Sequence, residues 1–523
     1  MPGGMFERYE QLAGPDEMFD RDGSIRPAYR AFAERLAHWD VAEYHLRQSR
    51  ADLALLNAGI TFTVYSDEQG TERIFPFSLI PRIIGSREWA HVEAGLIQRV
   101  RALNLFLLDV YNAQRSIRDH VVPAEVVFGA PEYSLRMVGF EPPLGVYAHI
   151  AGVDLVRDQN ERFVVLEDNL RTPSGVSYVL ENRTVMVRVA PDVFPPHGVA
   201  PVNDYPSRLL AMLLEVRPPH VTEADCRVVI LTPGIYNSAY FEHSFLAQQM
   251  GVPLVEGVDL VTHNERVYLR STSGLEPVHV IYRRVDDAFL DPLAFRADSM
   301  LGVTGLMSAY RAGNVTVTNA VGTGIADDKV VYRFVPDIIR YFLNEEPLLP
   351  NVETFAATVP EEREFIRRHA RELVIKPANA SGGYGVLIGP QASDDRIAET
   401  LAAMDAEPRQ WIAQPLQEFS TIPTFQDDGL HARRADLRPY ILTGASTWVL
   451  PSALTRVALR AGSYVVNSSQ GGGSKDTWVL TDDDELDEAD TPSSTATTGT
   501  DAASPSRSSS QSSSQSSSQS ATQ

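Results

Sequence analysis

The amino-acid sequence predicts a mixed α/β (α+β) protein that ends in a tail without stable structure. Short apolar runs such as VVILTP, VHVIYRR and ELVIKP alternate with segments of helical pattern, and such a mixture is typical of α/β and α+β folds. One further stretch carries a long apolar stripe, which predicts a helix. A Ser/Gln-rich end with nothing to bury predicts the tail.

The apolar stripe lies between residues 89 and 110. Its apolar residues recur at spacings of three and four, which places them on one face of a helix. They are Trp89, Val92, Leu96, Val100, Leu103, Leu107 and Val110. A stripe of this kind indicates packing into a core and says nothing about chemistry.

The bulk composition excludes some classes of protein. The 523 residues include 46 basic and 68 acidic side chains, and a net charge of −22 argues against a general nucleic-acid binder. The one cysteine, Cys226, permits no disulfide within the chain, and we interpret it as a small buried residue rather than a catalytic thiol. The N-terminus has no signal-peptide pattern, and no run approaches the roughly 18 apolar residues that cross a bilayer. We therefore expect a cytoplasmic protein that binds neither nucleic acid nor membrane.

The tail begins near residue 481. Seven carboxylates stand among the nine residues 482–490, and SPSRSSSQSSSQSSSQSATQ follows. Because this composition cannot offset its ordering entropy, we expect residues 481–523 to be disordered.

The segment GVDLVRDQNERFVVLEDNLRTPSG, residues 152–175, predicts a hairpin with metal-binding chemistry. Two apolar strands flank a polar turn, and Glu167 and Asn169 share one face of the second strand while Asp168 points the other way. With the turn near Asn160, Asp154 is expected diagonally across from Glu167. Two carboxylates and an amide oxygen suit magnesium, although the acids could also be incidental to a surface hairpin.

The segment ELVIKPANASGGYGVLIGP, residues 372–390, predicts an anion-binding loop. A strand leads into Lys376, and Gly382, Gly383 and Gly385 follow, so that backbone N–H groups can approach an anion closely. It is not a Walker A loop, because the lysine precedes the glycines.

The order of these signals carries a resemblance. After a helical stretch opening at Lys329 come Lys376 with its glycines, then WIAQPLQE, RRADLRPYIL and LTRVALRAGSYVVNSSQGGGS. This succession resembles the ATP-grasp superfamily, with its magnesium hairpin displaced far upstream. VLEDNLRTPSGVSYVLENR, YRRVDDAFLDP and VVNSSQGGGSKDTWVL are similar to the bacterial circularly permuted ATP-grasp type 2 proteins, which are relatives of the glutathionylspermidine synthetase ligase domain. The likeness covers roughly residues 15–480.

The resemblance implies one permuted ATP-grasp domain over 1–480, in three parts. Residues of about 15–200 hold the metal hairpin, about 201–325 lie on the substrate side, and about 326–480 bind nucleotide. The family pattern assigns metal, nucleotide and catalytic roles to matching residues. They are Asp154, Glu167 and Asn169 for Mg²⁺; Lys329, Lys376, Gly382, Gly383, Gly385 and Gln414 for ATP; and Arg438, Arg456 and Asn467 for catalysis.

The activity that the resemblance implies is a Mg-ATP-dependent carboxylate–amine ligase that forms a peptide-like amide through an acyl phosphate. The alternatives are a nucleotide-binding scaffold without turnover and a phosphotransferase on the same fold. The family also implies carboxylate and amine substrates that are small molecules or peptides, with small helical and transglutaminase-like proteins as partners. Two local questions stay open: Arg283 and Arg284 could bind an acidic substrate or form ion pairs, and Arg434 could pair with Asp436.

Overall fold

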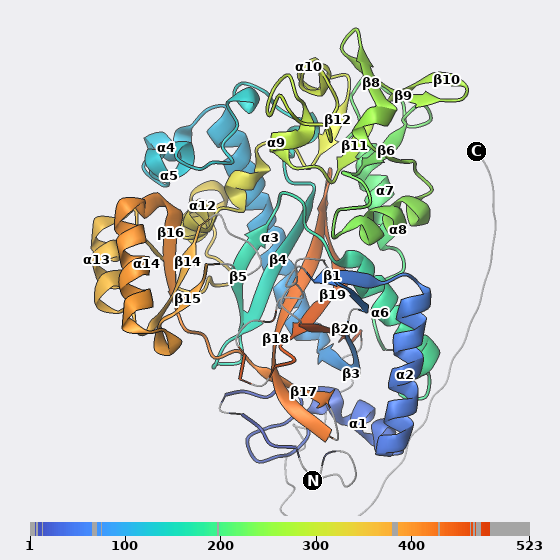
Figure 1. Cartoon of the computed structure of the whole chain (residues 1–523), viewed down its shortest axis with the longest axis vertical. Helices are drawn as coiled ribbons and strands as arrows, with labels where there is room; N and C mark the ends of the chain where they lie inside the picture. The colour runs from blue at the N-terminus through green and yellow to red at the C-terminus, as the bar shows by residue number, and fades with distance from the viewer. Residues whose placement is uncertain are drawn as a thin grey trace, which may run out of the picture. The chain divides into compact units, whose positions relative to one another are not determined.

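A seven-stranded mixed sheet forms the centre of the computed structural model of this chain (Figure 1). Six strands follow the order β3-β20-β19-β18-β4-β5, and β17 pairs with β18. All neighbouring pairs are antiparallel except β20 with β3. Their bounds are β3 Phe77–Ile84, β4 Ile150–Arg157, β5 Phe163–Asn169, β17 Thr421–Gln426, β18 Gly429–Thr443, β19 Thr447–Val457 and β20 Gly473–Val479.

The structure describes most of the chain up to residue 481. The described residues are 6, 9–12, 14–64, 71–74, 76–195, 198–378, 385–426, 429–460, 462–463, 466 and 472–481. By contacts the chain divides into the unit Met1–Asp483 and the unit Asp484–Gln523. Of the predicted disordered tail, residues 482–523 lie outside the described residues, whereas Thr481 is described and donates from its backbone to Gly198 O at 3.0 Å. The predicted three-part division of 1–480 stays a prediction.

The predicted long helix is confirmed as α3, Ser86–Tyr111. All seven residues of the predicted stripe are buried, because this helix runs along one face of the central sheet and also packs against α12, Val335–Leu343 (Figure 1). The apolar periodicity of the sequence therefore marks the core-facing side of the longest helix that the structure describes.

A separate small lobe, residues 355–415, packs its own hydrophobic core. Its four-stranded antiparallel sheet has the order β13-β16-β14-β15, with β13 Phe355–Ala356, β14 Leu373–Pro377, β15 Leu387–Ile388 and β16 Trp411–Pro415. Helices α13, Pro360–Arg368, and α14, Asp394–Ala406, lie together on the outer side of this sheet (Figure 1).

A parallel four-stranded sheet of order β12-β11-β6-β7 forms a third layered region. Its strands are β6 Val228–Leu231, β7 Leu254–Val255, β11 Val280–Arg283 and β12 Thr316–Thr318, with α7 Tyr205–Glu215 and α8 Tyr240–Met250 packed beside them. A small three-stranded antiparallel sheet is inserted between β7 and β11 of this region. Its strands are β8 Leu260–His263, β9 Arg266–Ser271 and β10 Gly274–Val278.

The remaining elements pack around these sheets. They are α1 Arg30–Leu36, α2 Val41–Asn57, β1 Thr61–Val64, β2 Thr71–Ile74, α4 Arg115–Arg118, α5 Ala124–Phe128, α6 Val176–Val189, α9 Asp287–Leu290, α10 Leu306–Arg311 and α11 Lys329–Tyr332. One of them, α6, lies against β19 and β20 of the central sheet. The predicted helical stretch that opens at Lys329 is thus two helices, α11 and α12.

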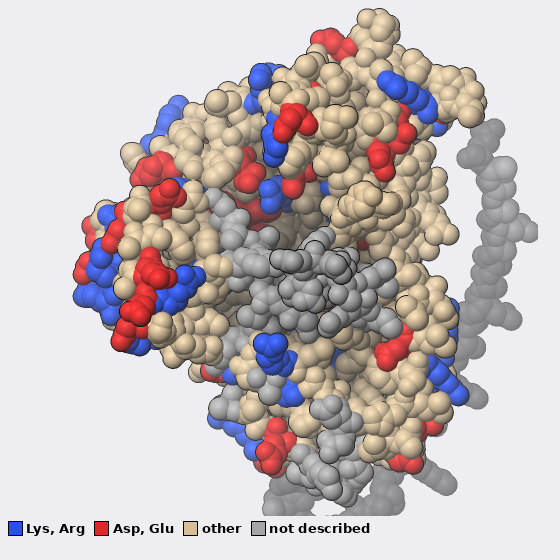
Figure 2. Space-filling model, viewed as in Figure 1, with Lys and Arg blue, Asp and Glu red and all other residues tan. Residues whose placement is uncertain are grey.

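The surface of the small lobe carries both signs of charge. On the face drawn in Figure 2, Lys and Arg side chains over α13 and α14 are interspersed with Asp and Glu. Within the part of the chain that the structure describes, no helix is both long enough and apolar enough to pass through a bilayer.

Candidate functional site

The predicted hairpin at residues 152–175 is confirmed as β4 and β5. Its register differs from the sequence-based expectation: Asp154 lies directly opposite Glu167, not diagonally across from it. A register shift between Asp154 and Leu155 accounts for the difference, because a bulge moves every later pair by one residue. Asp154 and Glu167 therefore lie side by side on the same face of the sheet.

Asp154 is enclosed by two arginines from neighbouring strands. Arg438 on β18 donates to both Asp154 carboxylate oxygens, at 2.7 Å for Nη2 to Oδ2, and Arg456 Nη2 on β19 lies 2.8 Å from Oδ2. Burial alone would raise the pKa of Asp154, but the two guanidinium groups outweigh it and hold the pKa well below its usual range. A carboxylate oxygen has two lone pairs, and among the described residues Oδ1 accepts from Arg438 alone, so it keeps one lone pair for another ligand.

Asp436 belongs to the same cluster and was missed as a site residue in the sequence. It lies directly opposite Arg456 and accepts from Arg456 Nε at 2.9 Å. The proposed pairing of Arg434 with Asp436 is wrong, because Arg434 Nη2 binds Glu418 Oε2 at 2.7 Å instead. One signal could have revealed Asp436: it stands two residues before Arg438, and strand alternation puts both on one face.

Lys376 and Gln414 meet on adjacent strands of the small lobe. Lys376 Nζ on β14 donates to Gln414 Oε1 on β16 at 2.6 Å, and Gln414 Nε2 donates to Thr354 Oγ1 at 2.9 Å. Burial lowers the pKa of Lys376 to about 8, against the opposing effect of the Glu167 carboxylate. Gln414 thus holds the Lys376 ammonium group, and the Glu167 carboxylate is close enough to favour its charged form.

A cavity of about 170 Å³ lies between the small lobe and the central sheet. Its polar wall holds Asp154, Glu167, Lys376, Gln414, Asp436 and Arg456, and its apolar wall holds Leu166, Val374, Val386, Ile388, Leu416, Phe419 and Val466. The volume is below the roughly 300–1,000 Å³ of typical small-molecule pockets, which suits one apolar ring system enclosed at one end of a larger ligand. The apolar residues were missed in the sequence, since only the folded lobes bring them together.

Lys329 reaches the same group of residues from the start of α11. Asp328 caps this helix by accepting from the backbone N–H of Val330 at 2.7 Å. The cap fixes the start of the helix and thereby the position of Lys329, its first residue. Lys329 Nζ lies 3.5 Å from Glu167 Oε2. The structure therefore brings together Lys329, Lys376 and Glu167, three residues to which the family resemblance assigns roles in one site.

Three of the predicted residues lie outside the described residues: Gly382, Gly383 and Asn467. Gly385 is described and has a φ of 74°, a left-handed conformation that favours glycine. An added Cβ there would approach Pro377 to 2.9 Å, so the chain turns closely over the end of β14.

The oxygen ligands of the hairpin suit a magnesium ion. Glu167 and Asn169 follow each other on one face of β5, and the amide nitrogen of Asn169 finds no hydrogen-bond partner among the described residues. Within those residues no group of three or more His, Cys, Asp or Glu could hold a metal. Magnesium commonly takes one or two carboxylates and completes its shell with water and phosphate, so Asp154, Glu167 and Asn169 fit this ion.

Arg283 and Arg284 serve the structure. Arg283 donates to Asn319 O at 2.8 Å and pairs with Asp287 at 2.6 Å, and it is 1% exposed. Arg284 donates to Pro173 O at 2.8 Å and lies 3.3 Å from Glu242 Oε1. The geometry thus favours ion pairs over an open site for an acidic substrate.

Several curated proteins are similar to this chain. An uncharacterised protein of Synechocystis sp. is 52% identical over 466 residues, which cover 89% of this chain and 96% of that protein. An uncharacterised protein of Mycobacterium tuberculosis is also 52% identical, over 89% of this chain and 84% of its own length. A putative glutamate–cysteine ligase of Frankia casuarinae is 42% identical over 91% of this chain, which spans only 54% of that protein.

The fold also resembles a solved structure, a glutathione synthetase-like effector from Globodera pallida without ligand. The TM-score is 0.54 at 11% identity, over 84% of this chain and 98% of that one. At such low identity the likeness concerns the fold alone. A family model described as circularly permuted ATP-grasp type 2 matches residues 81–458, and the chain therefore belongs to this family, as its resemblance implies.

Proposed function

We propose that this protein is a Mg-ATP-dependent ligase that joins a carboxylate to an amine through an acyl phosphate. The cavity between the small lobe and the central sheet carries the proposal. It joins an apolar slot to a cluster that holds both cations and acids, the combination that a base with a triphosphate and magnesium requires.

Each group of residues would contact a different part of Mg-ATP. The apolar wall encloses the adenine, and Lys376 and Lys329 neutralise phosphate charge on either side of Glu167. Asp154, Glu167 and Asn169 would hold magnesium, which acts as a Lewis acid on the phosphate oxygens. Arg438, whose Nε and Nη2 donate to Asp154, would turn its remaining N–H groups to the charge that develops on the transferred phosphoryl group.

The reaction proceeds in two steps. A carboxylate oxygen of the substrate attacks the γ-phosphorus, the bond to the β–γ bridging oxygen breaks, and ADP leaves. The amine nitrogen then attacks the carbonyl carbon of the acyl phosphate, inorganic phosphate leaves, and the nitrogen loses a proton. The protein supplies positioning and charge stabilisation in both steps.

The relatives support this class of reaction. Proteins named as putative glutamate–cysteine ligases, from Frankia casuarinae and Frankia alni, match over 91% of this chain. That name describes the joining of a carboxylate to an amine. Since the chain spans about half of each, the specific substrates of those proteins are not transferred to it.

The test combines binding with trapping. Calorimetry with ATP and Mg²⁺ is expected to show binding by the wild type and a loss of about tenfold or more in Lys376→Ala, because one buried charge contact to phosphate is removed. Candidate carboxylates are then offered with ATP and hydroxylamine, which converts an acyl phosphate to a stable hydroxamate.

Each outcome separates the alternatives. ADP release with a hydroxamate supports the ligase. A stable phosphate ester in place of an amide would indicate a phosphotransferase. Binding of ATP without turnover on any carboxylate would favour the scaffold, and a wild type that binds no Mg-ATP would remove the basis of all three.

A further inference from the structure

The back of the metal hairpin is held by a buried arginine that the reaction does not use. Arg99, on α3, donates from Nε and Nη2 to the two oxygens of Asp168, both at 2.6 Å. Both side chains are 1% exposed. Asp168 stands between Glu167 and Asn169 on β5 and points to the opposite face, so this fork fixes the strand from behind.

The third donor of Arg99 connects β5 to another part of the chain. Arg99 Nη1 donates to Asn351 Oδ1 at 2.7 Å, and Asn351 Nδ2 donates to Tyr332 O at 2.8 Å, the last residue of α11. One buried guanidinium therefore links the strand with the metal ligands to the helix that begins at Lys329.

Asn351 belongs to a linking segment, residues 350–354, that enters the small lobe. This segment lies along β5 like a short extra strand: Val165 N donates to Pro350 O at 2.8 Å, and Val352 N donates to Val165 O at 2.9 Å. Further on, Thr354 Oγ1 donates to Val352 O and accepts from Gln414, both at 2.9 Å, and Gln414 holds Lys376.

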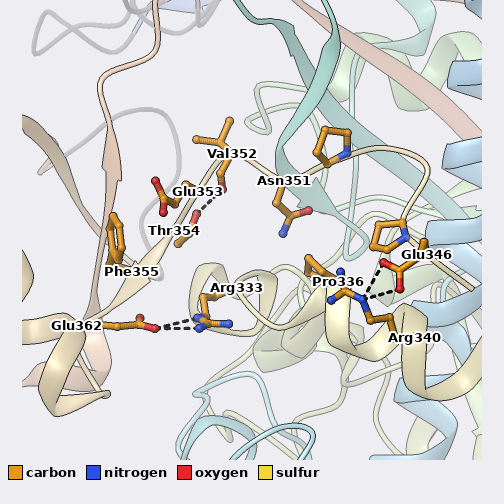
Figure 3. A pocket seen from close by; sticks show the side chains of 12 residues that line it. Arg333, Pro336, Arg340, Glu346, Asn351, Val352, Glu353, Thr354, Phe355 and Glu362 are labelled. Carbon is orange, nitrogen blue, oxygen red and sulfur yellow. Dashed lines mark hydrogen bonds and ion pairs between the residues drawn. The ribbon is translucent and has the colours of Figure 1, made fainter.

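The linking segment borders a cavity on its other side. A cavity of about 430 Å³ opens there, and Figure 3 shows Asn351, Val352 and Thr354 along its wall, with the Arg333–Glu362 pair across from them. The contacts that hold the segment to β5 therefore come from the other side. They are the two backbone bonds to Val165, the packing of Val352 against Val156 and Val164, and the side-chain bonds of Arg99 and Asn351.

We propose that Arg99 and Asn351 are positioning residues that set the distance between the metal ligands on β5 and the nucleotide contacts Lys376 and Gln414. The inference rests on the proposed function, because it concerns how Mg²⁺ and ATP are aligned in that same cavity. Changing a group that hydrogen-bonds a metal ligand typically costs about 10- to 100-fold in affinity or activity. Arg99 acts on the ligands only through their neighbour Asp168, so the lower end of that range is expected.

The test uses the full chain in four forms: wild type, Arg99→Lys, Asn351→Ala and a matched control, Arg183→Lys. The Arg183 guanidinium is also buried, binds Asp476 Oδ2 at 2.8 Å and two backbone carbonyls, and lies on α6. A lysine keeps the positive charge but cannot form the two-point contact of a guanidinium with a carboxylate. Both Arg→Lys variants should therefore lose a similar amount of stability. Asn351→Ala leaves the Asp168 pair intact and keeps the test valid if Arg99→Lys does not fold.

Two measurements decide the outcome: Mg-ATP affinity by calorimetry, and hydrogen exchange of backbone amides in β5 and residues 350–354. In Arg99→Lys and Asn351→Ala we expect faster exchange in both segments and an affinity about tenfold lower, with neither change in Arg183→Lys. The inference is overturned if the variants exchange and bind like the Arg183→Lys control.

The exchange measurement separates this inference from the proposed function. A wild type that binds no Mg-ATP refutes the function. Faster exchange in Arg99→Lys without a change in affinity shows that the network is structural only, and it overturns the positioning role while the function stands.

Discussion

Both faces of the β4–β5 hairpin carry carboxylates, but the partners of these carboxylates differ between the faces. On the back face, the Asp168 carboxylate receives a complete fork from Arg99, and both groups are buried. On the front face, Glu167 has a side chain 32% exposed and a lysine no nearer than 3.5 Å, and the Asn169 amide nitrogen finds no partner among the described residues.

The difference separates an acid that serves stability from the acids that would take a ligand under the proposed function. A buried pair with every bond made stabilises the fold only while both partners remain, whereas loosely paired oxygens beside a cavity keep their lone pairs for a cation. Asp154 lies between these cases: it faces the cavity, yet two arginines hold it. Neighbouring residues of one strand can thus be assigned opposite roles from their partners alone.

The largest expected effect on stability comes from removing the ion pair of Asp168 with Arg99 on the back face. Asp168→Asn should lower the free energy of unfolding by about 3–5 kcal/mol, because it leaves the Arg99 cation buried without a carboxylate. Denaturant unfolding measures the change. The control is Asp337→Asn, whose partner Arg340 lies 3.0 Å away in a pair with both side chains 47% exposed, and it should cost less than about 1 kcal/mol. Equal stability of Asp168→Asn and wild type would refute the comparison.

The matched change on the front face, Glu167→Gln, should leave stability nearly unchanged and weaken the binding of magnesium. Glu167→Gln removes one charge from a partly buried pair whose charged atoms lie 3.5 Å apart, so the free energy of unfolding should change by about 1 kcal/mol at most, far less than in Asp168→Asn. Magnesium binding in the presence of ATP should weaken by about tenfold or more, since an amide is a poorer ligand than a carboxylate. A Mg²⁺ titration followed by calorimetry tests this. If Glu167→Gln unfolds far more easily and binds Mg²⁺ as before, the assignment of the two faces is reversed.

Strand alternation and helical periodicity were enough to predict some parts of this site. The face shared by Glu167 and Asn169, the strand that leads into Lys376 and the helix α3 all follow from local patterns. The register of the hairpin could not be predicted, because it depends on a bulge.

Contacts between residues on strands far apart in the sequence could not be predicted either. Arg438 and Asp154 are 284 residues apart, and only the assembled sheet brings their strands together. The apolar slot, made by two lobes with separate cores, has no local pattern at all.

A smaller effect concerns pH and sharpens the role of Lys376. Burial lowers its pKa to about 8, so the lysine is charged below pH 8 and neutral above it. A bound triphosphate favours the charged form, and Mg-ATP affinity should therefore fall by up to about tenfold per pH unit as the pH rises from about 8 to 10. Calorimetry across this range measures it. Lys376→Met should bind weakly at every pH and lack this slope, and a slope that survives in the variant would assign it to another group.

The smallest effect is expected far from both faces, at Cys226. This thiol precedes β6 in the parallel sheet, packs against an apolar cluster and is half-buried, and burial raises its pKa to about 11. Few thiolates then exist at neutral pH, so iodoacetamide should react slowly, and Cys226→Ser should bind Mg-ATP like the wild type and change stability by less than about 1 kcal/mol. Turnover is measured beside binding, because a nucleophilic role would appear only there. A Cys226→Ser variant that binds Mg-ATP normally but loses turnover would show that the chemistry is not confined to the front face of the hairpin. It would also require a covalent step that Lys376, Arg438 and the hairpin acids do not provide.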